Sequence, residues 1–262
     1  TIHRLWSAGL RVLVLETDSP AAIRRQVSFS EAVYDGTATV EGVTAERIAS
    51  ADRASVNHVL EEGRVPLLVD PEGSSIPLLK PDIVVDAIIA KKNLGTAKEM
   101  APLVIGVGPG FTAGEDVDLV VESMRGHNLA RILETGSALA NTGIPGNIGG
   151  YTKERVIHAA AEGYMKNLHQ IGDVVRKGEK IARIYEQMSP EGVFSGRFVS
   201  VEATIPGVLR GLIREGYHFQ KGFKIADIDP RESELANCFT ISDKASSIGG
   251  SVLEAVCRYV NG

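Results

Sequence analysis

A repeat in the second half of the chain constrains its fold more than any other feature. The stretch 171–184, IGDVVRKGEKIARI, matches 215–228, EGYHFQKGFKIADI, at an offset of 44 positions and without a gap. Seven positions are identical in the two stretches, whereas composition alone gives roughly one match in a window of that size. Each copy predicts three strands joined by glycine turns. Two interlocking copies predict a flattened antiparallel sandwich with quasi-twofold symmetry.

The repeat resembles the biotinyl/lipoyl family, whose halves each carry a G-D-x-V-x-x-G-x-x-L/I turn. The matching residues here are Gly172, Asp173, Val175, Gly178 and Ile181. Carriers of that family modify a lysine on the hairpin between the two halves, which corresponds to 185–198. That hairpin has no lysine, so we expect neither covalent biotin nor covalent lipoate. The resemblance implies a barrel-sandwich hybrid that acts as a scaffold, because fold alone does not give function.

The first half alternates strand-like and helix-like patterns. Short apolar runs at 11–16, 65–71, 82–93 and 101–110 predict buried strands, the last of them running into glycines, and 50–63 predicts a capped helix. This alternation favours a Rossmann-like α/β domain with a parallel sheet. Glu16 ends the first run, where such a domain holds a ribose; a solvent-facing strand end is the alternative.

Four segments are expected along the chain. Residues 1–115 form the Rossmann-like domain, whose first strand is missing from the sequence, and 116–152 form a β-rich linker with an RGH turn. Residues 153–230 form the barrel-sandwich hybrid, and 231–262 form a helical segment that packs back on the first domain. Ser242 is the expected N-cap of the last helix. The pair Gly249–Gly250 predicts close backbone packing or a later helix start.

The densest cluster of glycines is GVGPGFTAGED, residues 106–116. Backbone N–H groups of such a loop, at the end of a parallel strand, form a nest that binds anions. The alternative is a tight strand exit that needs positive φ angles. The loop lacks the GK[ST] ending of a Walker loop and the spacing of G-x-G-x-x-G. The candidate ligand-binding residues are Gly108, Pro109, Gly110, Phe111, Thr112 and Gly114.

Charged and polar residues at neighbouring strand ends complement this loop. Asp86, Lys91 and Asn93 follow the preceding strand, and Arg125 lies in the RGH turn. Cations at adjacent strand ends would contact an anionic ligand. Each of them alone is better explained as a solvated surface charge, and it is their clustering with the glycine loop that makes a ligand site an equal alternative. His127 is the candidate general acid or base. The histidines show no metal-ligand spacing, so no metal site is predicted.

Composition excludes several classes of function. The net charge is −5 and the basic residues are dispersed, which argues against nucleic acid or an anionic membrane as partner. No window approaches 18 uncharged apolar residues, so no transmembrane segment is predicted. The two cysteines, Cys238 and Cys257, lack metal-type spacing. A cytoplasmic protein with ordinary buried thiols is expected, with a disulfide or a reactive thiol as alternatives.

Several stretches together resemble one family across essentially the whole chain. That family is the selenium-dependent molybdenum hydroxylase accessory family of the YqeB type. The resemblance implies a role in maturation, a hydroxylase or its maturation machinery as partner, and a nucleotide or a molybdopterin-type anion as ligand. The stretches are VLVLETDSPAAIRRQVSFSEAVYDG, DAIIAKKNLGT, GVGPGFTAGEDVDLVVESMRGHNL, NTGIPG and DIDPR followed by SDKASSIGGSVLEA.

The sequence therefore predicts an accessory factor that binds an anionic cofactor or nucleotide at the glycine loop. Two alternatives stay open: a dinucleotide-dependent enzyme of the same pathway, and a structural adaptor that docks through the repeat module. Whether the protein catalyses a reaction is left open by its residues, and an oligomer is compatible with all three hypotheses.

Overall fold

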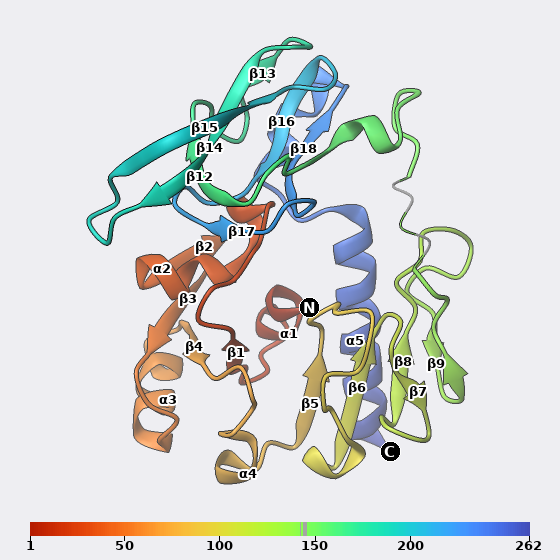
Figure 1. The fold of residues 1–262 in the computed structure, drawn as a ribbon. Helices are drawn as coiled ribbons and strands as arrows, with labels where there is room; N and C mark the ends of the chain where they lie inside the picture. The colour runs from red at the N-terminus through yellow and green to blue at the C-terminus, as the bar shows by residue number, and fades with distance from the viewer. Residues whose placement is uncertain (142, 144–145) are drawn as a thin grey trace.

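The computed structural model describes residues 1–141, 143 and 146–262. Thr142, Ile144 and Pro145 of the NTGIPG stretch lie outside the described residues. The first half of the chain forms two small sheets, and the second half forms two further sheets above them (Figure 1). Within the described ranges, no helix is long and apolar enough to cross a bilayer.

The first sheet is mixed. Its order is β1-β4-β3-β2, in which β4 pairs in parallel with β1 and β3, while β2 and β3 form an antiparallel hairpin. The hairpin turn is the EG signal, since Glu41 and Gly42 both have positive φ, whereas Gly36 of the DG signal ends α2 before the hairpin begins. The strands are β1 (Val14–Glu16), β4 (Val65–Val69), β3 (Val43–Ile48) and β2 (Thr37–Val40).

The second sheet is also mixed, and it is separate from the first. Its order is β5-β6-β8-β9, with β9 antiparallel to β8, and a short ladder of β7 with β10 lies beside it. The strands are β5 (Ile83–Asp86), β6 (Leu103–Val107), β8 (Leu119–Val121), β9 (Ile132–Leu133), β7 (Thr112–Ala113) and β10 (Gly136–Ser137).

Helix α1 lies between these two sheets, and α5 packs against the second. Leu5 of α1 packs in the core of the second sheet together with Val252 and Val256 of α5, and Ile2 and Trp6 face the core of the first sheet. Ser242 caps α5, because its side chain accepts the Ala245 N–H. The helices are α1 (Ile2–Ser7), α2 (Ala32–Asp35), α3 (Arg53–Glu61), α4 (Ile76–Leu79) and α5 (Asp243–Asn261), and the 3-10 turns are η1 (Arg25–Val27), η2 (Phe29–Glu31), η3 (Lys98–Met100), η4 (Lys153–Arg155) and η5 (Glu232–Cys238).

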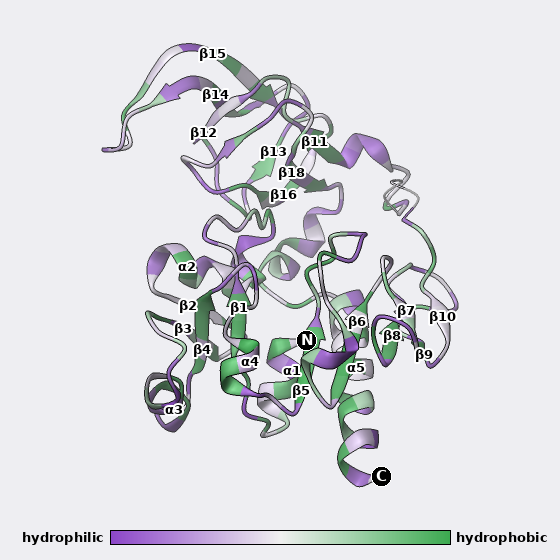
Figure 2. Ribbon diagram, turned by 60° about the horizontal axis from the view of Figure 1, so that its bottom comes forward, coloured by the Kyte–Doolittle hydropathy of each residue, from purple (hydrophilic) through white to green (hydrophobic). Residues whose placement is uncertain are grey.

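The second half consists of two antiparallel sheets, ordered β11-β18-β16-β13 and β15-β14-β12-β17. The two sheets share one large core, in which Met165, Leu209 and Ile225 are fully buried. Figure 2 shows that hydrophobic and hydrophilic residues are mixed along these strands. The strands are β11 (Val156–His158), β18 (Lys224–Asp229), β16 (Gly207–Leu212), β13 (Val174–Val175), β15 (Phe194–Glu202), β14 (Lys180–Met188), β12 (Gly163–Asn167) and β17 (His218–Phe219).

The 44-residue repeat is confirmed in the strands and turns. Strands β12, β13 and β14 begin 44 residues before β16, β17 and β18 respectively. Gly178 and Gly222 lie in equivalent turns with φ of 82° and 87°. Each copy also places its short middle strand in the sheet of the other, because β13 pairs with β16 and β17 pairs with β12.

The predicted fold class is nevertheless wrong. The sequence predicted a Rossmann-like parallel-sheet domain joined to a barrel-sandwich hybrid, whereas the first half contains two mixed sheets and the second half two antiparallel ones. The strand patterns could not show that β3 belongs to a hairpin and also pairs with β4. Nor could they show that α1 lies between the edge strands β1 and β5, so that the strands divide into two sheets (Figure 1).

Candidate functional site

The glycine loop connects β6 to β7 and approaches its neighbours very closely. Gly110 has φ of 116°, and a Cβ there would lie 2.7 Å from the backbone carbon atoms of Lys92. A Cβ on Gly108, which has φ of 84°, would lie 2.7 Å from the Ser123 hydroxyl. Both positions require glycine, because their φ angles are positive and because a side chain there would collide with the neighbouring residue. Phe111 is 4% exposed and packs in the core below the loop.

Three N–H groups of this loop already have acceptors inside the protein. The Gly108 and Gly114 amides donate to the carbonyls of Val121 and Val117, both at 2.8 Å. The Thr112 amide donates to Asp116 Oδ1 at 2.7 Å. These three groups therefore stabilise the loop itself and are not free to bind an anion in this conformation.

The structure brings Asp86 and Asn93 together with the glycine loop. Asp86 is buried and accepts hydrogen bonds from the Thr96 hydroxyl at 2.6 Å and the Ile88 amide at 3.0 Å. Asn93 accepts the Thr96 amide at 2.8 Å and donates to Asp116 Oδ2 at 3.3 Å. Asp116 thus joins the segment after β5 to the glycine loop, and these polar groups hold two loops in one arrangement.

The other predicted residues lie further apart. Lys91 is exposed, with φ of 65°. Burial lowers the pKa of the Lys224 amine, and Lys91 adds a smaller contribution to that lowering. Arg125 forms two hydrogen bonds of 3.1 Å with Asp243, the first residue of α5. The His127 ring is exposed in the turn after Arg125.

Glu16 ends β1 in the first sheet and is half-buried. Its Oε1 accepts the Thr17 amide at 2.8 Å, while burial raises the pKa of its carboxyl group. In the part of the chain that the structure describes, no hydrogen bond or ion pair joins Glu16 to the glycine loop. The structure therefore separates Glu16 from the other predicted site residues.

A group of charged side chains that the sequence analysis missed lies on β16, β18 and the segments packed against them. We call it the arginine cluster. Asp229 is 1% exposed and accepts two hydrogen bonds of 2.9 Å from Arg231. Arg155 is buried and contacts Asp227 at 3.3 Å. The arginine cluster comprises Arg24, Arg155, Arg210, Lys224 and Arg231 with the carboxylates of Asp227 and Asp229.

Two guanidinium groups of the arginine cluster have unused donors. Arg24 Nη2 donates to the carbonyls of Asn237 at 3.1 Å and Thr240 at 3.3 Å, and Arg210 Nη1 lies 3.9 Å from Asp229 Oδ2. The Nε atoms of Arg24 and Arg210 are buried, and neither has a partner among the described residues. A buried polar group without a partner costs about 1–3 kcal/mol. The pKa of Arg24 is lowered by burial and then by Arg210, so the two cations are close together.

Cys238 lies beside these arginines and is 1% exposed. Burial raises the pKa of its thiol, while Arg24 and Arg210 oppose that shift. Cys257, in contrast, is exposed on α5. Throughout the described ranges, no group of three or more His, Cys, Asp or Glu side chains is arranged to hold a metal ion.

The missed residues come from distant segments of the chain. Arg24 precedes η1, Arg210 lies on β16, and Cys238 ends η5. No local motif joins them, which is why spacing could not reveal them. One signal was present: Arg210 matches Lys166 in the repeat, whereas Asp227 takes the place of Arg183. A charge reversal between otherwise similar copies marks a surface whose surroundings differ.

Comparison with known proteins gives one strong similarity. The chain is 47% identical over 258 residues to "Uncharacterized protein YqeB" of Escherichia coli (strain K12), and the match covers 98% of the chain. The chain spans less than half of that protein, 45% of its length. This identity supports the YqeB family for the region covered. No family model matches the chain.

Similarities to solved structures are weak. They include product-bound EutE (DoeB) of Ruegeria pomeroyi (11% identity, 86% of this chain and 60% of the other, TM-score 0.27) and an aspartoacylase family protein of Mesorhizobium loti (7%, 83% and 84%, TM-score 0.29). A succinylglutamate desuccinylase/aspartoacylase of Rhodobacter sphaeroides gives 12% identity, 83% and 84% coverage and a TM-score of 0.27. Scores of this size carry no argument about function.

Proposed function

We propose that this chain, a relative of YqeB, belongs to an accessory factor for the maturation of a selenium-dependent molybdenum hydroxylase. In this proposal it holds an anionic ligand at the arginine cluster. The 47% identity to YqeB supports the family, and the motifs of the glycine loop and RGH turn connect that family to hydroxylase maturation.

The pair of unpartnered Nε atoms on Arg24 and Arg210 is the observation that carries the proposal. Guanidinium groups bind planar or tetrahedral oxyanions through several N–H donors at once. Cations also outnumber carboxylates in the arginine cluster, since Arg24, Arg155, Arg210, Lys224 and Arg231 surround Asp227 and Asp229. A bound oxyanion would supply both the missing acceptors and the missing negative charge.

The glycine loop has a supporting part in this proposal. Because Gly110 lies against the backbone of Lys92, the loop fixes the segment that carries Lys91. Burial is the main cause of the lowered pKa of Lys224 in the arginine cluster, and Lys91 adds a smaller contribution. The anion is therefore expected near the strand ends, with Lys91 at the margin of the site.

The adaptor alternative also has one observation in its favour. Strand β15 is the edge strand of its sheet and is exposed along most of its length. Phe198 and Val199 on this strand are 47% and 41% exposed. An exposed apolar edge strand is a surface on which another chain can add a strand.

Binding and complementation together test the proposed function. Full-length protein carrying Arg210→Met would be compared with Lys166→Met, which changes the equivalent position of the first copy. We expect inorganic phosphate to raise the melting temperature of the wild type and of Lys166→Met, but not of Arg210→Met. In cells that lack the chromosomal gene, Arg210→Met should fail to restore hydroxylase activity. Normal restoration by Arg210→Met, with no phosphate effect on the wild type, would refute the proposal.

A further inference from the structure

The segment that follows β5, residues 88–92, has an unusual backbone. We call it the lysine segment. Ile89 and Lys91 have φ of 60° and 65°, whereas the other three residues have negative φ. A left-handed backbone is unfavourable for residues other than glycine, and most of all for a β-branched side chain such as that of Ile89. Strained conformations of this kind persist only where the surrounding structure fixes them, and they are concentrated at functional sites.

The glycine loop and Asn93 fix the lysine segment in this conformation. The Lys92 backbone lies against Gly110, where a Cβ would be 2.7 Å away, and the Ile89 side chain lies near Gly108, where a Cβ would be 3.8 Å from Cδ1. Asn93 closes the end of the segment, because its side-chain oxygen accepts two later amides at 2.8 Å each. The glycines of the loop therefore allow the lysine segment to be held closely from one side.

The amides of the lysine segment are available to a ligand. The Ile88 amide donates to Asp86 Oδ1 at 3.0 Å, but the amides of 89–92 have no acceptor among the residues that the structure describes. Successive residues with φ of alternating sign turn their N–H groups towards one side, which is how backbone nests bind anions. Three amides of the glycine loop, in contrast, are already bonded inside the protein.

The positive charges of the lysine segment are not balanced by ion pairs. In the part of the chain that the structure describes, neither Lys91 nor Lys92 forms an ion pair with a carboxylate, whereas Lys98 pairs with Asp118 at 3.4 Å. The segment is mostly exposed, so its two ammonium groups and its amides can reach the same ligand. An anion is the ligand that this combination favours.

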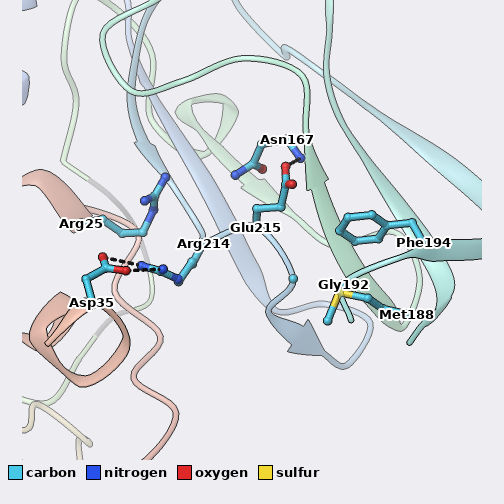
Figure 3. Close-up of a pocket in the computed structure, with 9 residues that line it drawn as sticks. Arg25, Asp35, Asn167, Met188, Gly192, Phe194, Arg214 and Glu215 are labelled. Carbon is cyan, nitrogen blue, oxygen red and sulfur yellow. Dashed lines mark hydrogen bonds and ion pairs between the residues drawn. The ribbon is translucent and has the colours of Figure 1, made fainter. Parts of the chain in front are cut away.

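A cavity of about 580 Å³ between the hairpin β14–β15 and the segment η1–α2 provides a contrast (Figure 3). There Arg214 donates two hydrogen bonds to Asp35, at 2.6 and 2.9 Å, and one to Glu31 at 2.9 Å. The charge of Arg214 is therefore balanced within the protein, and this cavity does not require an anion.

The lysine segment borders the arginine cluster. Burial is the largest cause of the lowered pKa of Lys224, the first residue of β18; Asp227 opposes the shift, and Arg155 and Lys91 add to it. Lys224 thus lies within electrostatic range both of the arginine cluster and of the lysine segment. One ligand with two charged groups can therefore contact both.

We propose that the ligand of the arginine cluster carries two anionic groups, the second of which binds to the lysine segment. Inorganic pyrophosphate is the simplest ligand of this class. The amides of 89–92 donate to oxygens of the second group, and Lys91 and Lys92 balance its charge. This inference rests on the proposed function, because the arginine cluster holds the first group.

Titration with two simple anions tests for the second group. Full-length protein would be titrated calorimetrically with inorganic phosphate and with inorganic pyrophosphate, both without divalent cations. We expect pyrophosphate to bind at least about tenfold more tightly than phosphate, because only pyrophosphate reaches both sets of donors. Equal affinities would refute this inference and leave the proposed function standing. Absence of binding by both anions would refute the proposed function, and this inference with it.

Substitutions assign the additional affinity to the lysine segment. Lys91→Met combined with Lys92→Met should lower the affinity for pyrophosphate about tenfold and bring it close to the affinity for phosphate. The matched control, Lys80→Met combined with Lys177→Met, removes two exposed lysines elsewhere, and Lys80 has a left-handed φ of 51° like that of Lys91. The control should keep the preference for pyrophosphate. A preference that survives in the first variant, or that is lost equally in the control, would refute the inference.

A second pair of variants isolates the contribution of the amides. Lys91→Gly and Lys91→Val remove the same charge from an exposed position, but only glycine adopts φ of 65° without cost. The glycine variant should therefore bind pyrophosphate about threefold more tightly than the valine variant, or better. Equal affinities of these two variants would refute the role of the amides of 89–92.

Discussion

The two copies of the repeat have the same backbone and different surroundings. The Gly178 amide donates to Ala203 in the second copy, and the Gly222 amide donates to Ala159 in the first, both at 2.8 Å. Equivalent side chains nevertheless differ, since Arg183 and Tyr185 of the first copy correspond to Asp227 and Asp229 of the second. The glycine turns therefore preserve the fold while the surface positions change.

What covers each copy explains this difference. In the first copy, the aromatic residues of the hairpin lie over the cations, with Arg183 4.7 Å from the Phe198 ring and Lys166 5.1 Å from the Phe194 ring. In the second copy, Asp229 is fully buried and paired with Arg231. The first copy thus keeps its cations beneath aromatic rings, and the second copy supplies the buried carboxylates of the arginine cluster.

The largest expected effect tests the shared backbone. A Cβ on Gly207 would lie 2.2 Å from the Asp229 carbonyl oxygen, and on Gly163 it would lie 2.3 Å from that of Tyr185. Changing either residue to alanine should separate paired strands and lower the free energy of unfolding by about 3 kcal/mol or more. Gly222→Ala, where φ is positive but space is open, should cost only about 1–2 kcal/mol. Chemical denaturation measures the free energy of unfolding of all three variants. A small loss for Gly163→Ala together with a large loss for Gly207→Ala would show that the two copies do not share the same backbone constraint.

The next effect tests the different surroundings. Asp229→Asn removes the buried charge that Arg231 and the largely buried Arg210 face. It should cost about 2–3 kcal/mol, because Arg210 then lacks its counter-charge and the hydrogen bonds from Arg231 become weaker. Tyr185→Phe, at the equivalent position, removes a weak contact of 3.5 Å with Arg183 and should cost less than about 0.5 kcal/mol. Similar costs for the two variants, measured by urea unfolding, would contradict the distinction between the copies.

Acid should lower the stability of the second copy more than that of the first. Burial raises the pKa of Asp229, but the hydrogen bonds of Arg231 outweigh it and the net pKa is lowered. A carboxyl group with a lowered pKa in the folded state stabilises the protein above its unfolded pKa of about 4, and loses that contribution as the pH falls. The stability difference between wild type and Asp229→Asn should therefore shrink below pH 4. If the melting temperatures of wild type and Asp229→Asn differ by the same amount from pH 6 to pH 2.5, the charge of Asp229 is not the cause of the stability difference.

A smaller effect concerns the aromatic cover of the first copy. Phe198→Leu removes the ring over Arg183 but keeps an apolar side chain. Because Phe198 is 47% exposed, the loss should be about 0.5–1 kcal/mol. Thermal unfolding of Phe198→Leu in the wild-type and Arg183→Met backgrounds isolates the pair, and equal losses in both backgrounds would show that the cation contributes nothing.

The smallest effect concerns the ion pair between Arg125 and Asp243, the first residue of α5. The hydrogen bonds of Arg125, followed by that of the Lys244 amide, lower the pKa of Asp243 to about 2. Its contribution is present above pH 4 and is lost as the pH falls towards 2. Both partners are more than half exposed, so solvent screening limits the cost of Asp243→Asn to less than about 1 kcal/mol. Melting temperatures of Asp243→Asn and wild type should converge near pH 2, and divergence there would contradict the assigned cause.

The sequence predicted those features that depend on local chemistry. The repeat offset, the turn glycines and the Ser242 cap follow from residue type and spacing, and all are present. The predicted close packing at Gly249 is also confirmed, because a Cβ there would lie 3.0 Å from Arg4. Apolar patterns could not show which strands pair, so the predicted parallel sheet was wrong.

The candidate site was predictable to the same limited extent. Asp86 and Asn93 lie near the glycine loop because the ends of parallel strands meet at one edge of a sheet. Arg24, Arg210 and Cys238 are brought together by packing between segments far apart in the chain. The spacing of residues along the chain cannot indicate such packing. The only indication is that equivalent positions of the two copies of the repeat carry different side chains.

The exchange of the middle strands has a mechanical consequence. Because β13 lies in the sheet of the second copy and β17 in that of the first, neither copy can close its sheets alone. The covalent link between the copies passes through the hairpin β14–β15, whose turn at 189–193 is largely exposed. A protease that cuts this turn would leave two fragments still interleaved and held by the shared core. The repeat module would then behave as a non-covalent dimer of its own halves, separable only by unfolding both.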